Sequence, residues 1–225
     1  MKMKTGKLFI VATPIGNYQD ITLRALDTLR SVDGVICEEV RLGSTLLKKL
    51  NITNKPLLAL NEHNEDEQTG EILIRLHKGE TFGLISDCGT PGFEDPGSRL
   101  VLEALQQGVQ VIPLPGPSSL MAALSISPIP LKEFLFAGFL PRKDAERISK
   151  LKHLQALKTH LVLMDTPYRL GKLMEEVESV FGKFRQATLA LDISLPGELI
   201  LHDTLAEIRQ RVQARKGEFV LIVYR

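Results

Sequence analysis

Two turns rich in glycine, proline and hydroxyl residues are the part of this sequence best suited to bind a small molecule. Residues 86–92 have the sequence Ser-Asp-Cys-Gly-Thr-Pro-Gly, and residues 113–119 have the sequence Pro-Leu-Pro-Gly-Pro-Ser-Ser. Each turn follows an apolar run that is typical of a buried strand. Glycine lets the backbone approach a ligand closely, and proline keeps a turn rigid. Together they favour a shaped pocket, although either turn alone is also explained as a tight turn without a ligand.

Charged side chains follow further apolar runs of the first half. Residues 13–17 (Thr-Pro-Ile-Gly-Asn), 37–41 (Cys-Glu-Glu-Val-Arg) and 60–65 (Leu-Asn-Glu-His-Asn-Glu) each end one of them. In an open parallel sheet, ligands bind outside the carboxyl ends of the strands, so we expect one common rim. A carboxylate or an imidazole there can accept a proton, and an arginine can anchor a phosphate. Any one of these charged residues could instead be an ordinary solvated loop residue without a function. The predicted catalytic residues are Glu39, Arg41, Glu62 and His63, with Glu65 as a further candidate base.

The order of apolar runs and amphipathic segments predicts the elements that position this rim. In the first half we expect strands at 8–12, 34–37, 57–60, 81–85 and 109–112, and helices at 21–31, 44–50, 67–78 and 97–107. Asp20 is placed to cap the first of these helices. Strand–helix alternation of this kind predicts a mostly parallel sheet that is covered on both faces.

The second half has a looser pattern. We expect a helix at 119–125 and strands at 134–138, 160–164, 187–191, 199–202 and 218–224. A turn at Pro196-Gly197 predicts a hairpin, and hence a mixed sheet. The prediction is therefore an α/β protein with an N-terminal domain at 1–115, which carries the substrate rim and part of the cofactor cleft, and a C-terminal domain at 116–225.

Composition sets limits on the class of protein. The 225 residues are 44% hydrophobic and 24% charged with a formal net charge of +1, so nucleic acid binding needs a local basic patch. Cys37 and Cys88 are the only cysteines and form no Cys-x-x-Cys motif, which suits a reducing cytoplasm. The apolar run 8–12 after Met1-Lys2-Met3-Lys4 is too short for a signal peptide or a membrane span. We expect a cytoplasmic protein with no membrane contact.

Several motifs of common enzymes are missing from the sequence. It contains no Gly-x-x-x-x-Gly-Lys-Ser/Thr phosphate loop and no Gly-x-Gly-x-x-Gly dinucleotide fingerprint. It contains no His-Glu-x-x-His spacing and no Gly-x-Ser-x-Gly nucleophile elbow. Nucleotide hydrolysis, dehydrogenase chemistry, serine hydrolysis and a metal site are therefore not expected.

The motifs that are present resemble those of the ribosomal RNA small subunit methyltransferase I family, which belongs to the tetrapyrrole methylase superfamily. The resemblance runs in order along nearly the whole chain. The matching segments are residues 13–17, 20–22 (Asp-Ile-Thr), 62–65 (Glu-His-Asn-Glu), 86–92, 113–118, 138–143 (Gly-Phe-Leu-Pro-Arg-Lys) and 216–223 (Lys-Gly-Glu-Phe-Val-Leu-Ile-Val).

This resemblance implies two α/β domains with S-adenosylmethionine held in the cleft between them, and usually a homodimer. The implied reaction is 2′-O-methylation of a cytidine ribose in small-subunit ribosomal RNA, which would be the partner. In the superfamily the proline-glycine turns and the Asp-x-Gly-Thr-Pro loop hold the cofactor. The residues that match as cofactor-binding are Pro14, Asp87, Gly89, Thr90, Pro117, Ser118 and Ser119, and more loosely Phe139, Met164 and Leu191.

The chain departs from the family pattern in three segments. Residues 38–41 are Glu-Glu-Val-Arg in place of Glu-Asp-Thr-Arg, and residues 164–169 are Met-Asp-Thr-Pro-Tyr-Arg in place of Tyr-Glu-Ser-Pro-His-Arg. Residues 191–195 replace the family's Arg-Glu-Leu-Thr-Lys, and family members commonly carry a small further domain beyond the position of Arg225. Two alternatives therefore stay open, a methylase of a small molecule such as a tetrapyrrole precursor and a cofactor-binding regulatory protein.

The densest basic stretch of the chain lies between residues 142 and 152. Its cations are Arg142, Lys143, Arg147, Lys150 and Lys152. They are expected either to contact an RNA backbone or to form the solvated face of an amphipathic helix.

Overall fold

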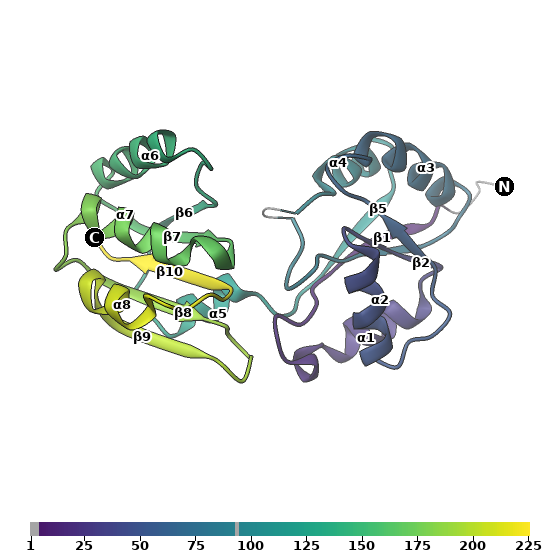
Figure 1. Cartoon of the computed structure of the whole chain (residues 1–225). Helices are drawn as coiled ribbons and strands as arrows, with labels where there is room; N and C mark the ends of the chain where they lie inside the picture. The colour runs from purple at the N-terminus through teal and green to yellow at the C-terminus, as the bar shows by residue number, and fades with distance from the viewer. Residues whose placement is uncertain (1–4, 93–94) are drawn as a thin grey trace. The chain divides into compact units, whose positions relative to one another are not determined.

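The chain forms two compact units, Met1–Ser118 and Ser119–Arg225 (unit 1 and unit 2; Figure 1). The computed structural model describes residues 5–92 and 95–225, so the four residues in front of the first apolar run lie outside the described part. Each unit contains one five-stranded sheet. The roles expected for the two halves, as substrate rim and cofactor cleft, stay a prediction.

Unit 1 contains a fully parallel sheet. Its strands are β1 (Lys7–Val11), β2 (Gly34–Cys37), β3 (Leu57–Ala59), β4 (Phe82–Leu84) and β5 (Gln110–Leu114). They lie in the order β3-β2-β4-β1-β5, and every neighbouring pair is parallel. The carboxyl ends of β4, β1 and β5 are therefore adjacent, and the ends of β2 and β3 follow on one side.

Helices cover both faces of this sheet, as the alternating pattern predicts. They are α1 (Leu23–Ser31), α2 (Val40–Lys49), α3 (Glu65–His77) and α4 (Ser98–Gln106), with a short 3₁₀ turn at Tyr18–Asp20. One core joins the sheet to α3 and α4 through Ile72, Leu76 and Leu100. The other joins it to α1 and α2 through Leu29 and Leu47.

Two helix starts in unit 1 differ from expectation. Asp20 does not cap α1, because the hydroxyl oxygen of Thr22 accepts the hydrogen bond from the backbone N–H of Ala25 at 3.1 Å. Helix α2 begins at Val40 rather than Ser44, since a carboxylate oxygen of Glu39 accepts the N–H of Arg41 at 3.2 Å. The second difference places Arg41 in the first turn of α2.

Unit 2 contains the expected mixed sheet. Its strands are β6 (Phe134–Gly138), β7 (His160–Asp165), β8 (Gln186–Leu191), β9 (Leu199–Thr204) and β10 (Phe219–Val223). The order is β6-β7-β10-β8-β9, in which β6 and β7 are parallel and the other pairs are antiparallel. The β8–β9 hairpin is confirmed, and the α/β fold class with it.

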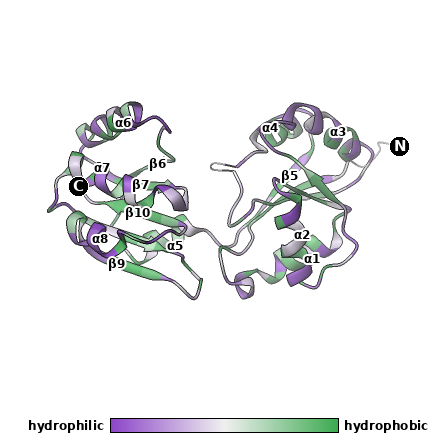
Figure 2. Cartoon of the chain, viewed as in Figure 1, coloured by the Kyte–Doolittle hydropathy of each residue, from purple (hydrophilic) through white to green (hydrophobic). Residues whose placement is uncertain are grey.

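The sheet of unit 2 is also covered on both faces. Helices α6 (Asp144–Ala156), α7 (Leu170–Phe181) and α8 (Leu205–Val212) share one core with the sheet, and α5 (Ser119–Ser125) lies on the other core. Hydrophobic residues follow the strands of both sheets in Figure 2. Within residues 5–92 and 95–225, the helices all fall short of the length and apolar character needed to cross a membrane.

Candidate functional site

Hydrogen bonds join the three glycine- and proline-rich turns of unit 1 to one another. The backbone N–H of Thr13, just beyond β1, donates to the carbonyl oxygen of Gly89 at 2.8 Å. The hydroxyl of Ser86, just beyond β4, donates to the same carbonyl at 3.3 Å. The hydroxyl of Thr90 donates to the carbonyl oxygen of Pro117, beyond β5, at 2.8 Å. The turns that the sequence singled out therefore form one connected frame.

Glycine is required at two points of this frame. Gly89 has φ +84°, and a Cβ there would lie 3.1 Å from Cγ2 of Ile15. At Gly116 a Cβ would lie 2.8 Å from the Cβ of Ala12, closer than real Cβ atoms approach. A side chain at either position would force the turns apart.

The predicted cofactor residues of unit 1 all belong to this frame or border it. Pro14 is buried, Thr90, Pro117 and Ser118 are half-buried, and Asp87 is exposed. The mixture of a tight backbone and an exposed carboxylate is the chemistry expected of a site that grips a small polar ligand.

Carboxylates gather beside this frame at the ends of β2, β3 and β4. Partial burial, followed by the charges of Asp87, Asp95, Glu62 and Glu39, raises the pKa of Glu38. Although the Asp87 side chain is solvent-accessible, nearby protein removes part of its hydration, and this desolvation raises its pKa together with the charge of Glu39, against a backbone hydrogen bond from Glu39 that lowers it. The cluster is therefore short of positive charge. Within the described part of the chain, no group of three or more His, Cys, Asp or Glu side chains could hold a metal ion.

The predicted catalytic residues lie on the β2 and β3 side of the rim. Glu39 uses one carboxylate oxygen to cap α2. Arg41, in the first turn of that helix, is exposed and pairs with no acidic side chain in the described residues. Nε2 of His63 lies 3.6 Å from a carboxylate oxygen of Glu62, and both side chains are more than 80% exposed, at 84% and 82%.

Glu65 is not available as a free base. Its carboxylate oxygen accepts the backbone N–H of Gly97 at 2.9 Å, directly in front of α4. The structure therefore assigns it to holding α4 against the start of α3, a contact between residues 32 positions apart that the sequence gives no sign of. Cys37 is likewise inert, because burial raises the pKa of its thiol to about 11.

The remaining predicted cofactor residues belong to unit 2. Ser119 begins α5, Phe139 follows β6, Met164 is the fifth residue of β7 and Leu191 ends β8. Strand pairing sets Val220 against Met164, and Phe219 against Leu191. Met164 and Leu191 therefore lie at the same end of the strands, beside the start of β10. Phe139 is 45% exposed, whereas Leu191 is fully buried and offers a ligand its backbone alone.

Arg147 corrects the interpretation of the basic stretch. Its side chain is 2% exposed and forms paired hydrogen bonds with Glu176, at 2.5 Å from Nε and 2.6 Å from Nη2. Nη1 also donates to the carbonyl oxygens of Pro141 and Arg142, at 3.1 and 2.8 Å. An RNA phosphate cannot reach this guanidinium, so Arg147 is excluded as a surface contact.

A second arginine, Arg169, also bonds to the loop at residues 140–142 that follows β6. Nη2 of Arg169 donates to the carbonyl oxygen of Pro141 at 3.1 Å and lies 3.2 Å from a carboxylate oxygen of Asp165. Burial raises the pKa of Asp165, while the N–H of Thr166 and the charge of Arg169 lower it. Two guanidiniums therefore fix the backbone that follows Phe139, a role that the sequence did not reveal.

Asp192, in the altered segment at 191–195, contacts the segment that leads into β10. Asp192 has φ +53°, and its carboxylate accepts the N–H of Glu218 at 3.1 Å. A Cβ at Gly217 would lie 2.4 Å from that carboxylate, so glycine is needed there. The departure from the family sequence is accommodated by the matching Gly217-Glu218 pair.

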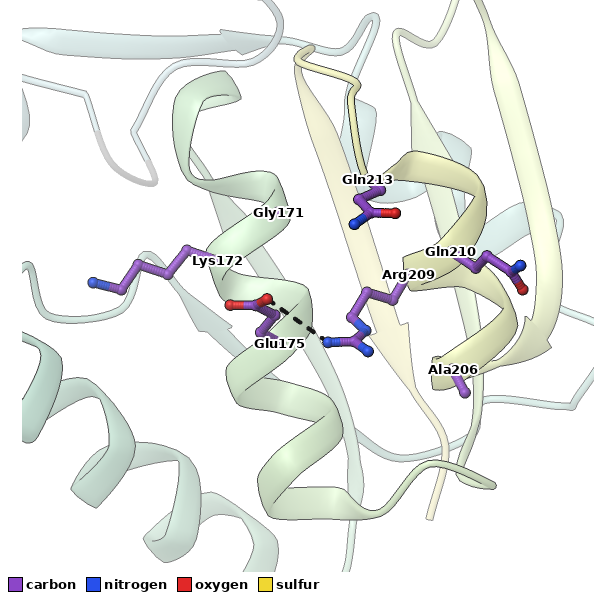
Figure 3. Close-up of a pocket in the computed structure, with 7 residues that line it drawn as sticks. All are labelled: Gly171, Lys172, Glu175, Ala206, Arg209, Gln210 and Gln213. Carbon is purple, nitrogen blue, oxygen red and sulfur yellow. Dashed lines mark ion pairs between the residues drawn. The ribbon is translucent and has the colours of Figure 1, made fainter.

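A groove of about 650 Å³ lies between α7 and α8 in unit 2 (Figure 3). Arg209 spans it, with Nη1 3.7 Å from Glu175 and Nε 2.8 Å from Glu178. None of the predicted site residues lines it. Arg209 of α8 pairs with two glutamates of α7, and Lys172 pairs with Asp144 of α6, so we assign the groove to helix packing.

Known proteins of one family are similar to this chain over most of its length. The family described as Tetrapyrrole (Corrin/Porphyrin) Methylases matches residues 7–209. The chain is 42% identical to the ribosomal RNA small subunit methyltransferase I of Xylella fastidiosa, over 97% of this chain and 81% of that protein. It is 42% identical to the protein of the same description from Pseudomonas aeruginosa, over 98% and 79%.

Solved structures with the same fold are more distant in sequence. A uroporphyrin III C-methyltransferase from Thermus thermophilus has a TM-score of 0.67 at 20% identity, covering 97% of both chains, and it has also been solved with S-adenosyl homocysteine. A diphthine synthase has a TM-score of 0.75 at 16% identity, covering 97% of this chain and 90% of that one. These likenesses establish the fold, and the closer sequence relatives establish the family. The chain is a methyltransferase of the ribosomal RNA small subunit methyltransferase I family, within the tetrapyrrole methylases.

Proposed function

We propose that this protein binds S-adenosylmethionine at the frame of unit 1 and methylates the 2′-hydroxyl of a cytidine ribose in small-subunit ribosomal RNA. The observation that carries the proposal is the connected frame itself. Three turns that come from adjacent strand ends are tied by hydrogen bonds from Thr13 to Gly89 and from Thr90 to Pro117, and the Ser86 hydroxyl stabilises the middle turn from within. Ligands of parallel sheets bind at such strand ends.

The residues at the frame fit this cofactor in shape and charge. Gly89 and Gly116 allow a close backbone, and Asp87 and Glu38 supply carboxylates whose pKa values are raised first by desolvation and then by neighbouring carboxylates. S-adenosylmethionine carries positive charge on its sulfonium and amino groups, which would favour the ionised form of these carboxylates. Pro14, Asp87, Gly89, Thr90, Pro117 and Ser118 would hold it, and Ser119, Phe139, Met164 and Leu191 stay a prediction as further contacts.

The bound cofactor would supply an electrophilic methyl group. The chain's own contribution is mainly to orient the acceptor, an effect worth about 7–11 kcal/mol when two reactants are held aligned. A general base that takes the hydroxyl proton would add about 10²- to 10⁴-fold. The side chains of Glu62 and His63 are exposed, and neither caps a helix as Glu39 does. We therefore assign the role of base to this pair and phosphate anchoring to Arg41.

A second candidate is methylation of a small molecule such as a tetrapyrrole precursor. The net charge of +1 and the fold shared with a uroporphyrin III C-methyltransferase favour it. The identity of 42% to ribosomal RNA methyltransferases, against 20% to that enzyme, favours RNA. A regulatory protein that binds the cofactor without turnover is the third reading.

One labelling experiment separates these three functions. The purified protein is given methyl-labelled S-adenosylmethionine with undermethylated small subunits, with a small-metabolite extract, or alone. Label in the ribosomal RNA, located at a ribose 2′-oxygen, is the expected result. Label in the metabolite fraction refutes the RNA substrate, and binding without label in either supports the regulatory protein.

An Asp87→Asn variant tests the cofactor site in the same assay. Loss of a hydrogen-bonded polar contact should weaken S-adenosylmethionine binding by about 1–3 kcal/mol. Asp66→Asn, on exposed α3 in the same unit, is the matched control and should bind normally. Equal affinity of all three proteins would place the cofactor elsewhere.

We also propose a cytoplasmic homodimer. A chain with only two cysteines suits a reducing compartment, and closed two-fold assembly is the commonest form of soluble oligomers. Sedimentation at micromolar concentration should give twice the chain mass of 25.0 kDa. A monomer mass would contradict the dimer.

A further inference from the structure

A basic hollow lies at one end of the strands of unit 2, opposite to the end that carries the predicted cofactor residues. Three depressions of about 760, 600 and 260 Å³ overlap there: Arg225 lines all three, and Lys158 and Arg185 each line two of them. Lys132 and Lys183 extend the same surface. We call these five cations and the depressions between them the basic hollow.

Strand pairing defines where the hollow lies. Phe134 pairs with His160 at the starts of β6 and β7, and the N–H of Tyr224, after β10, bonds to Gln186 at the start of β8. Neighbouring strands lie about 4.8 Å apart, so these four strand ends extend over about 14 Å. The C marker in Figure 1 stands at this end of β10.

None of the five cations of the hollow forms an ion pair with a carboxylate among the described residues. Glu133 is the one acidic side chain among its described lining residues. Other carboxylates of unit 2 pair elsewhere, Asp144 with Lys172 and Glu178 with Arg209. Unpaired cations around a concave surface attract a polyanion and release its counterions on binding.

The floor of the hollow is ordered and carries an exposed aromatic ring. The N–H of Arg225 donates to Nδ1 of His160 at 3.0 Å, and the hydroxyl of Tyr224 lies 2.6 Å from that of Thr188. Phe184 is 76% exposed, with Nζ of Lys183 at 4.8 Å from its ring centroid. Basic grooves with exposed aromatic rings are the surfaces on which single-stranded nucleic acid stacks.

We infer that the basic hollow is a second RNA-binding surface, which holds the substrate's phosphate backbone away from the reacting nucleotide. This inference rests on the proposed RNA substrate. Strand β7 has six residues, so the hollow lies about 17 Å along the strands from the end that carries Phe139, Met164 and Leu191. A ribosomal RNA reaches both ends of these strands, whereas a ligand of small-molecule size occupies only one.

Paired charge reversals in the full chain test the surface. The hollow variant is Lys158→Glu with Lys183→Glu, and the control is Lys48→Glu with Lys78→Glu, two exposed positions of unit 1. Each lost contact with single-stranded RNA should lower the salt slope of binding by about 0.7, which at 0.1 M salt is about fivefold in affinity. We expect the hollow variant to bind small subunits about 25-fold more weakly, and the control to bind them within twofold of the parent. Phe184→Ala should weaken binding at least about fivefold through lost stacking.

Kinetics and a second polyanion complete the test. The KM for small subunits should rise in the hollow variant, while kcat and S-adenosylmethionine affinity stay at the parent's values. Equal subunit affinity in the hollow variant and the control overturns the inference. So does a hollow variant that keeps its RNA affinity but loses binding to vesicles containing phosphatidylglycerol, since that result assigns the surface to a membrane. A parent that binds cofactor but neither binds nor methylates small subunits instead refutes the proposed function.

Discussion

The hydrogen bond between Thr90 and Pro117 is the side-chain link between two of the three turns, so breaking it tests the frame directly. Thr90→Val exchanges the hydroxyl for a methyl group of similar size. It removes the bond of 2.8 Å to the carbonyl oxygen of Pro117 and leaves the half-buried side chain otherwise in place.

The expected size of the effect follows from that single bond. A neutral hydrogen bond contributes about 0.5–1.5 kcal/mol to stability, and the Pro117 carbonyl would be left without this donor. A loss of about 1 kcal/mol lowers the melting temperature of a domain of this size by about 4 °C. Because the cofactor is proposed to need both turns in place, up to about fivefold of S-adenosylmethionine affinity should be lost as well.

Thr69→Val is the matched control. The hydroxyl of Thr69 is fully buried in α3 and has no hydrogen-bond partner among residues 5–92 and 95–225, so its removal relieves an unsatisfied polar group. This variant should melt at or above the temperature of the parent and bind S-adenosylmethionine equally well. Calorimetry and thermal unfolding give both quantities. If Thr90→Val matches the parent in both, the two turns are not held together by this bond and the frame argument is wrong.

Three further predictions concern charged groups. The pKa of Glu38 is raised in the folded protein, so stability should be greatest when the pH lies below the pKa that Glu38 has in the unfolded chain. Stability should then fall as the pH rises through the higher pKa of the folded protein. Glu38→Gln should flatten this pH dependence and raise the melting temperature at pH 8. Glu62→Gln should lower kcat by about 10²-fold with normal cofactor affinity, and Arg41→Ala should mainly raise the KM for small subunits; full activity in both would make them ordinary rim charges. Arg147→Met should lower the free energy of unfolding in urea by about 3–5 kcal/mol, because Glu176 and two carbonyls lose their partner, whereas the exposed Arg142→Met should change it by less than about 0.5 kcal/mol.

The sequence predicted the strands and turns well because both depend on local patterns. The run 34–37 is β2 and the run 134–138 is β6, with the bounds expected. The glycine at 89 was singled out for its turn, and its φ of +84° is a conformation that favours glycine. Such features are set by residues close together in the chain.

Features set by distant partners could not be predicted. Arg147 belongs to a basic stretch by composition, yet Glu176, 29 residues away, draws it into the interior. Glu65 has the neighbours of a solvated loop carboxylate, yet Gly97 uses it as an acceptor. In both cases the signal is a tertiary contact between charged or polar groups, which leaves no periodic trace in the sequence.

The polar groups of the rim divide into two sets with different freedom to change. Those beyond β4, β1 and β5 bond to one another, as Thr90 does to Pro117, so a substitution there disturbs the neighbouring turn as well. Beyond β2 and β3, Glu65 bonds to Gly97, whereas the exposed side chains of Arg41 and Glu62 form no hydrogen bond to another turn among the described residues. The departure from the family sequence at residues 38–41 falls in the second set, and Glu39 still caps α2 there. A substitution in the second set can therefore change the substrate without breaking the hydrogen bonds of the frame, so substrate assays, rather than cofactor binding, decide between the proposed RNA substrate and the small-molecule alternative.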